Sequence, residues 1–321
     1  MCSSLRRRVC LIAPPSRPRR TTACRRSAGG YTSARPGVGE ERAGPARTAS
    51  CAPARRPPNE RSVTMPPHIG TGLRVERRGD VLRLTLARPE RRNAFDGPLL
   101  DALEDALRTL ASSERAVLLA GEGDAFCAGA DLRWFAGAED DRSERRAEAL
   151  RVSRAFAALD AVPVPVVARV HGAAVGGGVG LAAIADVVLA SEDATFQLAE
   201  VRVGLVPAMV APYVARRIGP VRARAWAMSA ERIGAARAAD WGLVDIVVPP
   251  GKLDAVAEER VEALQSGDPA AVRAIKAFLR DIEGRAAAEA ADAAVRAISA
   301  RLADPEARRR IRAFLERGGR G

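Results

Sequence analysis

The chain has 321 residues, of which 47% are hydrophobic, and a formal net charge of +12. Residues 1–64 hold 14 Arg and three Glu, or +11, so residues 65–321 hold the other 37 basic and 36 acidic residues and carry only +1. This balance excludes an overall electrostatic attraction of the folding part to nucleic acid, and the lack of any apolar run of about 18 residues excludes a membrane-spanning helix.

Residues 1–64 are rich in Arg, Pro, Ser and Ala and hold four of the five cysteines, at spacings that match no common zinc or disulfide pattern. With few large apolar side chains to offset the entropy of ordering, this segment is predicted to be disordered. It is interpreted as a misplaced gene start, an organelle transit segment or a nucleic-acid-binding arm.

The first interpretation of that segment is favoured because the chain uses only two Lys against 49 Arg, which is typical of high-GC coding, and because Met65 directly precedes the folded pattern. We therefore expect a chain beginning at Met65 to fold and retain full function. The expected location is a bacterial cytoplasm, or a mitochondrion if the segment is a transit peptide.

Alternating apolar residues predict two antiparallel strands at 73–79 and 81–88. Asp96-Gly97-Pro98 then begins an amphipathic helix that continues to about residue 110, and residues 116–120 form a buried strand. A glycine-bearing loop follows at 121–131 and leads into helical sequence.

A second buried strand is predicted at 164–170, followed by Gly176-Gly177-Gly178 and a helix of small residues to about 185. Another strand lies at 186–190, and the chain from 211 onward is mostly helical. These repeated β-β-α units predict an α/β fold with parallel pairing. We divide it into a core at 65–260 and a C-terminal helical region at 261–321.

Two glycine-bearing loops, 126–131 and 176–178, each leave a strand and enter a helix. Such loops expose backbone N–H groups where the helix dipole also favours negative charge. One loop would be weak evidence, but two predict a pair of hydrogen-bond donors. Neither loop has the spacing of a P-loop or a dinucleotide-binding fingerprint, so binding of phosphate groups is disfavoured.

Five segments occur in a characteristic order: R-P-E-R-R-N-A-F, F-C-A-G-A-D-L, H-G-A-A-V-G-G-G-V-G-L, F-Q-L-A-E-V-R-V-G-L-V-P and D-W-G-L-V-D-I-V-V. Over residues 73–321 the chain resembles the crotonase, or enoyl-CoA hydratase/isomerase, family. The resemblance implies a spiral of β-β-α units, an acyl-CoA thioester substrate, no cofactor, no metal and a homotrimer or dimer of trimers.

The resemblance also implies that the N–H groups of Ala128 and Gly177 form an oxyanion hole for the thioester carbonyl, with Gly129, Ala130 and Asp131 also binding substrate. Negative charge accumulates on the thioester oxygen when a proton leaves a neighbouring carbon or a nucleophile adds. Each preorganised donor is then worth roughly 3 kcal/mol.

Hydratases of the family carry two glutamates, and the matching positions here are Gly180 and Glu200. Two carboxylates can activate a water between them, whereas one carboxylate is enough to move a proton between two carbons. Glu200 is therefore the predicted acid/base. The alternative is a surface acid at a strand end, but its apolar neighbours Leu198, Val201, Val203 and Leu205 predict partial burial and a raised pKa.

Three further residues near these loops have structural alternatives. Asp131 either caps the helix that starts at Leu132 or faces the substrate. Cys127 has no histidine placed to activate it and is interpreted as a packing residue. His171 closes a buried strand without a serine or aspartate partner motif and is interpreted as a strand-end residue with satisfied hydrogen bonds, so a hydrolase is disfavoured.

The terminal helical sequence is similar to the helix of the family that contacts the adenine end of CoA, often from a neighbouring subunit. Phe314 is predicted to stack on adenine and Arg317 to pair with a phosphate. The alternative is a helix with a solvated basic face.

The pattern around 171–181 and 199–213 is most similar to bacterial hydratases of leucine and acyclic-terpenoid breakdown, which act on methylglutaconyl-like CoA esters. The predicted reaction is therefore hydration of an α,β-unsaturated acyl-CoA through Glu200. The alternative is a double-bond isomerase that uses Glu200 alone, and a minor alternative is a nucleic-acid-binding protein on the same scaffold.

Overall fold

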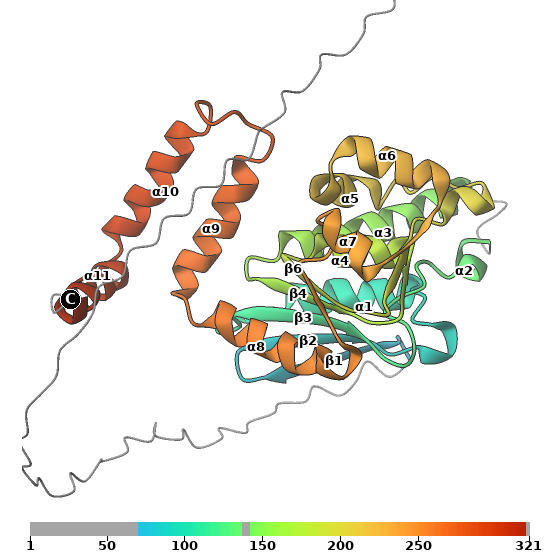
Figure 1. Ribbon diagram of the computed structural model, residues 1–321, viewed down its shortest axis with the longest axis horizontal. Coiled ribbons are helices and arrows are strands. Elements are labelled where there is room, and N and C mark those ends of the chain that lie inside the picture. The colour runs from blue at the N-terminus through green and yellow to red at the C-terminus, as the bar shows by residue number, and fades with distance from the viewer. Residues whose placement is uncertain (1–69, 137–141, 319–321) are drawn as a thin grey trace, which may run out of the picture. The chain divides into compact units, whose positions relative to one another are not determined.

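The computed structural model describes residues 70–136 and 142–318 (Figure 1). The segment 1–64, for which disorder was predicted, lies outside the described residues. Among the helices that are described, none is long and apolar enough to cross a membrane.

A six-stranded sheet forms the centre of the fold, in the order β1-β2-β3-β4-β6-β9. Its strands are β1 (Leu73–Arg78), β2 (Val81–Leu86), β3 (Ala116–Gly121), β4 (Val166–Val170), β6 (Val187–Ser191) and β9 (Ile246–Val248). β1 and β2 pair antiparallel, and every other neighbouring pair is parallel. The predicted α/β class and parallel pairing are confirmed.

β3 is covered on both faces of the sheet, and its successive residues point to opposite sides. Val117 and Leu119 of β3 belong to the large core under α1 (Gly97–Arg108), α3 (Arg142–Ala161) and α4 (Gly177–Ile184). The alternate residues Ala116 and Leu118 pack with α8 (Leu253–Gln265) on the other face. The strand at 116–120 is therefore apolar at every position, as expected for a strand covered on both sides.

A second sheet of three short strands carries the elements that lead to the glycine loops. It has the order β5-β7-β8, with β5 (Ala173–Val175), β7 (Thr195–Gln197) and β8 (Arg232–Gly234). β5 and β7 are parallel, and β8 joins β7 antiparallel. The sequence patterns missed these strands because three residues are too few to show a period.

The remaining short elements connect these layers. They are η1 (Pro89–Arg91), α2 (Leu132–Ala136), η2 (Glu200–Val203), α5 (Ala211–Ile218), α6 (Pro220–Ser229), α7 (Ala235–Asp240) and η3 (Pro250–Lys252). The region from 211 onward is mostly helical, as predicted, although β8 and β9 interrupt it.

Three helices follow the core: α9 (Pro269–Asp281), α10 (Ala291–Ala303) and α11 (Pro305–Gly318). α9 has no buried residue and is held to the core by polar contacts. Lys276 Nζ donates to Val164 O at 2.9 Å and to Asp186 Oδ2 at 2.5 Å, and Arg273 donates to Glu114 O at 2.8 Å. Exposed apolar side chains on these three helices are Ile275, Leu279, Val295, Ile298, Leu302, Ile311, Phe314 and Leu315.

Gly172 connects β4 to β5 in a conformation that only glycine adopts easily. Its φ is +56°, and a Cβ there would overlap the carbonyl of Asp124. We predict that Gly172→Ala lowers the free energy of unfolding by about 3 kcal/mol, measured by urea denaturation. Gly234→Ala is the matched control, because Gly234 has φ −84° and open space around its Cα. Equal stability of both variants would contradict the prediction.

Candidate active site

Three segments run side by side through the second sheet and end at the same edge. β5 pairs in parallel with β7 on one side and with the loop around Cys127 on the other. Cys127 N donates to Ala173 O at 3.1 Å, and Val175 N donates to Cys127 O at 2.9 Å. Because parallel strands present their carboxyl ends together, the residues that follow each segment converge. These residues are Ala130, Gly177 and Glu200.

The two glycine loops touch backbone to backbone. Gly129 has φ +90°, and a Cβ on it would lie 2.7 Å from Val175 O and 3.2 Å from Gly177 N. A Cβ on Gly178 would overlap the carbonyl of Cys127. Side chains at 129 and 178 would therefore push the loops apart, which explains the glycines that mark this motif.

The structure corrects the predicted donor in the first loop. Ala128 N donates to Arg92 O at 2.9 Å, so this N–H is already used. Gly129 O accepts a hydrogen bond from Phe95 N at 2.8 Å. Since the peptide between Gly129 and Ala130 is trans and planar, the Ala130 N–H points the opposite way, away from Phe95.

Within the described part of the chain, no protein acceptor is recorded for the Ala130 N–H. The Gly177 N–H is likewise without one there, because Gly177 is the first residue of α4 and the first turn of a helix leaves its donors unpaired. Ala130 and Gly177 both line one cavity. The donor pair that the geometry offers is thus Ala130 and Gly177.

Glu200 brings the acidic group of this cavity. Its Oε1 lies 3.0 Å from the position that a Cβ on Gly176 would take, and its Oε2 is buried with no hydrogen-bond partner among the described residues. Burial raises the pKa of the Glu200 carboxyl above its usual value. A carboxyl group of this kind is suited to exchanging protons near neutral pH.

The expected partial burial of Glu200 is confirmed, but the predicted reason for it is wrong in part. Of its apolar neighbours in sequence, Leu198 is buried, whereas Val201, Val203 and Leu205 are about half exposed. The carboxyl group is covered because η2 turns it toward the Gly176 backbone.

The cavity has a volume of about 510 Å³. α3 forms one wall through a stripe at helical spacing, namely Arg145, Ala149, Val152 and Phe156. The opposite wall comes from residues 203 and 205–210, and Phe95 contributes its ring. Among the described lining residues, Glu200 and Arg145 alone carry charge, so the cavity suits an apolar group beside one acid.

Gly180 does not open onto free space. A Cβ there would lie 2.7 Å from Phe156 Cε2 and 3.1 Å from Val210 Cγ2. Phe156 itself is fully buried, and its ring meets the Phe95 ring edge-on with a distance of 6.0 Å between the ring centroids. A larger side chain at 180 would therefore have to displace Phe156 or Val210, which both line the cavity.

Asp131 makes the contacts expected of a residue that caps the helix starting at Leu132. Its Oδ1 accepts from Arg133 N at 3.0 Å, and Arg91 donates to Oδ2 at 2.6 Å. Burial works against the charged form, but the bonds from Arg91 and Arg133 outweigh it and lower the pKa of Asp131. Asp131 is not among the described residues that line the cavity.

Cys127 and His171 support the loops from behind. Cys127 Sγ donates to Asn93 O at 3.2 Å, and burial raises the pKa of this thiol to about 12, which makes it a poor nucleophile. His171 Nε2 lies 2.7 Å from Gly123 O, and its Nδ1 lies 3.0 Å from an Arg169 nitrogen. These contacts fit the interpretation of Cys127 as a packing residue and of His171 as a strand-end residue with satisfied hydrogen bonds.

Phe314 and Arg317 lie on α11 and do not line the cavity in the described part of the chain. The Phe314 ring is 69% exposed, and the side chain of Arg317 lies outside the described residues. Their contact with CoA stays a prediction.

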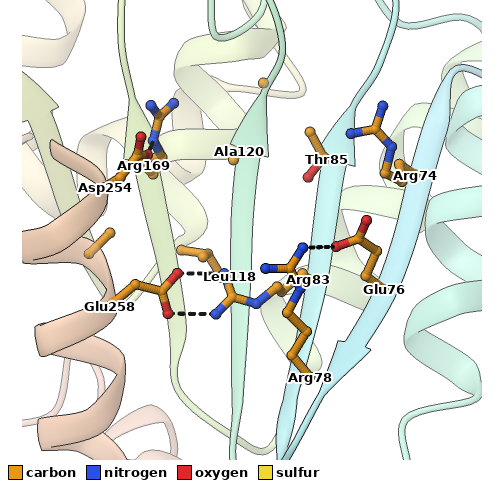
Figure 2. A pocket seen from close by; sticks show the side chains of 12 residues that line it. Arg74, Glu76, Arg78, Arg83, Thr85, Leu118, Ala120, Arg169, Asp254 and Glu258 are labelled. Carbon is orange, nitrogen blue, oxygen red and sulfur yellow. Dashed lines mark hydrogen bonds and ion pairs between the residues drawn. The ribbon is translucent and has the colours of Figure 1, made fainter. Parts of the chain in front are cut away.

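A second hollow lies over β1–β4 beside α8 and is lined mainly by charged groups (Figure 2). Its four arginines are each paired with an acid: Arg74 with Glu122, Arg78 with Glu76, Arg83 with Glu258 and Arg169 with Asp254. Because these charges pair with one another, the hollow is a weaker candidate for the active site than the cavity that contains Glu200. The described residues contain no group of three His, Cys, Asp or Glu placed to hold a metal.

Comparison with known proteins identifies the family of the chain. Residues 76–320 match the family model described as enoyl-CoA hydratase/isomerase. An enoyl-CoA hydratase of Mycobacterium smegmatis superposes with a TM-score of 0.74 at 34% identity, covering 77% of this chain and 96% of that one. AtuE of Pseudomonas aeruginosa gives a TM-score of 0.73 at 34% identity, covering 77% and 97%.

The enoyl-CoA hydratase AKT6-1 of Alternaria alternata is 38% identical over 159 residues, which are 48% of this chain and 51% of that protein. The chain thus matches about half the length of this relative. The match over 76–320 shows that the chain belongs to the enoyl-CoA hydratase/isomerase family, with the crotonase fold that was predicted.

The buried carboxyl of Glu200 should reduce stability at neutral pH. Because its folded pKa is raised, its contribution to stability is fully present below the unfolded value of 4.5 and is lost as the pH rises through the folded pKa. We predict that Glu200→Gln unfolds at higher urea concentration than wild type at about pH 7.5, and that the difference shrinks below pH 4.5. A variant less stable than wild type at neutral pH would show that Glu200 has a stabilising partner.

Proposed function

We propose that the protein binds an acyl-CoA thioester with the carbonyl oxygen between the Ala130 and Gly177 N–H groups and moves a proton with Glu200. One observation carries the proposal: a buried carboxyl oxygen lies in the same apolar cavity as these two donors, and none of the three has a hydrogen-bond partner among the residues that the structure describes. Two preorganised donors stabilise the negative charge that develops on the oxygen when a neighbouring carbon loses a proton.

The geometry supports double-bond isomerisation best. In a 3-enoyl thioester, the Glu200 carboxylate takes a proton from C2, and the electron pair moves into the thioester so that its oxygen becomes negative. Glu200 returns the proton to C4, which places the double bond between C2 and C3. One carboxyl group suffices for both transfers, and its raised pKa favours accepting the proton.

The filled space at Gly180 supports the same choice. A Cβ at this position would crowd Phe156 and Val210, so the second acid that could help to hold a water has no prepared space there. A single carboxyl group is enough for proton transfer between two carbons.

Hydration, which the sequence patterns favoured, is the second candidate. It is supported by the names of relatives such as the M. smegmatis enoyl-CoA hydratase. Water would add to C3 of a 2-enoyl thioester, such as a branched or methylglutaconyl-type ester, while Glu200 delivers a proton to C2.

Product masses distinguish the two reactions. We predict that 3-hexenoyl-CoA is converted to a conjugated thioester of unchanged mass, followed by absorbance and mass spectrometry. Crotonyl-CoA and methylglutaconyl-CoA, offered in parallel, should gain no water. A product heavier by one water would establish hydration instead, and inertness toward all three esters would remove the proposed function.

Glu200→Gln tests the acid/base separately. Turnover and solvent-deuterium incorporation should fall by about 100- to 10,000-fold, because the amide keeps the size of the side chain but cannot exchange the proton. Binding of hexanoyl-CoA should change little. Asp131→Asn is the control, since Asp131 is engaged with Arg91 and Arg133. Loss of turnover only in Asp131→Asn, with the fold intact, would place the acid in the first loop.

We also propose that α9, α10 and α11 bury their exposed apolar side chains against other copies in a closed homo-oligomer. Ile298 and Phe314, for example, are 57% and 69% exposed. In such an assembly Phe314 and Arg317 would meet the CoA of a neighbouring subunit. A monomer by light scattering would contradict this proposal.

A further inference from the structure

Phe95 contacts both loops that carry the donors. Its backbone forms an isolated parallel bridge with Ala130. Phe95 N donates to Gly129 O at 2.8 Å, and Asp131 N donates to Phe95 O at 2.8 Å. These two bonds fix the peptide groups on both sides of Ala130. The direction of the Ala130 N–H therefore follows from the position of the Phe95 backbone.

The ring of Phe95 lies against the second donor. A Cβ on Gly177 would overlap Phe95 Cζ and Cε1, so the ring packs directly on the Gly177 Cα. Phe95 is 1% exposed, and its ring meets Phe156 at a centroid distance of 6.0 Å and an angle of 69°. The ring therefore fills the space beside the first turn of α4 and supports it from the side of Phe156.

Asn93 holds Phe95 in this place. Asn93 is fully buried in the left-handed region at φ +57°, and its Nδ2 donates to Glu122 O at 2.8 Å and to Ala125 O at 2.7 Å. Its Oδ1 accepts from Arg88 N at 2.9 Å. Asn93 thus ties the chain just before Phe95 to residues 122 and 125, at the start of the first glycine-bearing loop. Phe95 itself pairs with Ala130 near the end of that loop.

We infer that Phe95 is a positioning residue that sets the spacing and direction of the Ala130 and Gly177 N–H groups. This inference rests on the proposed function, because it concerns the donors that would hold the thioester oxygen. A smaller side chain at 95 frees the start of α4 to shift relative to Ala130. The carbonyl of a bound thioester is then polarised less, although the apolar cavity still accepts the acyl chain.

The test compares Phe95→Leu and Phe95→Ala with wild type. Hexanoyl-CoA labelled at the thioester carbonyl is bound, and its carbonyl stretch is followed by difference infrared spectroscopy, since hydrogen bonds to the oxygen lower this frequency. In Phe95→Ala the frequency should return toward that of the free ester, kcat for 3-hexenoyl-CoA should fall about 100-fold, and the Kd of hexanoyl-CoA should change less than threefold. Phe95→Leu should lie between.

Leu103→Ala is the control for lost core packing, because Leu103 is fully buried in α1 and does not line the cavity. It should lower the unfolding midpoint yet keep the carbonyl frequency and kcat. Wild-type frequency and kcat in folded Phe95→Leu and Phe95→Ala would overturn the inference. If Phe95→Ala does not fold, a wild-type carbonyl frequency in Phe95→Leu would by itself overturn the inference. If wild type itself leaves the frequency of the free ester unchanged, the proposed function fails.

Discussion

The parallel register between the Cys127 loop, β5 and β7 is the constraint on which the site depends. β5 is only three residues long, yet it pairs with both neighbours. This pairing brings together three chain positions that are up to 70 residues apart in sequence, and it leaves their next backbone groups unpaired at one edge. Because a shift of one residue would turn each peptide group to the other side, the register determines which N–H groups are available.

Close backbone contact between the two glycine-bearing loops is the second condition for forming the site, and it limits which residues these loops tolerate. Gly129, Gly172 and Gly178 each lie where a Cβ would meet a carbonyl oxygen. Ion pairs form within the segment 88–96 and connect it to the first loop: Arg88 pairs with Asp96 at 2.7 Å, and Arg91 pairs with Asp131 at 2.6 Å. Rigid support of this kind is what preorganised donors require.

The sequence predicted the large features, because they repeat over many residues. Strands at 73–86 and 116–120, the helix from Asp96 and the two glycine loops follow from apolar periodicity and capping residues, and the structure confirms them. β5, β7 and β8 were missed since three residues show no period. Ala128 was assigned as donor from the resemblance, and the sequence does not show that its N–H already donates to Arg92 O. The direction of the Ala130 N–H is fixed by the hydrogen-bond partner of the preceding Gly129 carbonyl. That partner, Phe95, lies 34 residues earlier in the chain than Gly129.

The choice between water addition and proton transfer depends on a packing feature that no linear motif contains. Gly180 alone leaves the chemistry open, because a glycine could equally line a water-filled space. Only the fold shows that Phe156, from the middle of α3, occupies that space together with Val210. A carboxylate side chain at 180 would have to displace Phe156 or Val210. This packing limits which side chains the fold accepts at that position, and it is the observation behind the proposal that Glu200 acts without a second carboxylate.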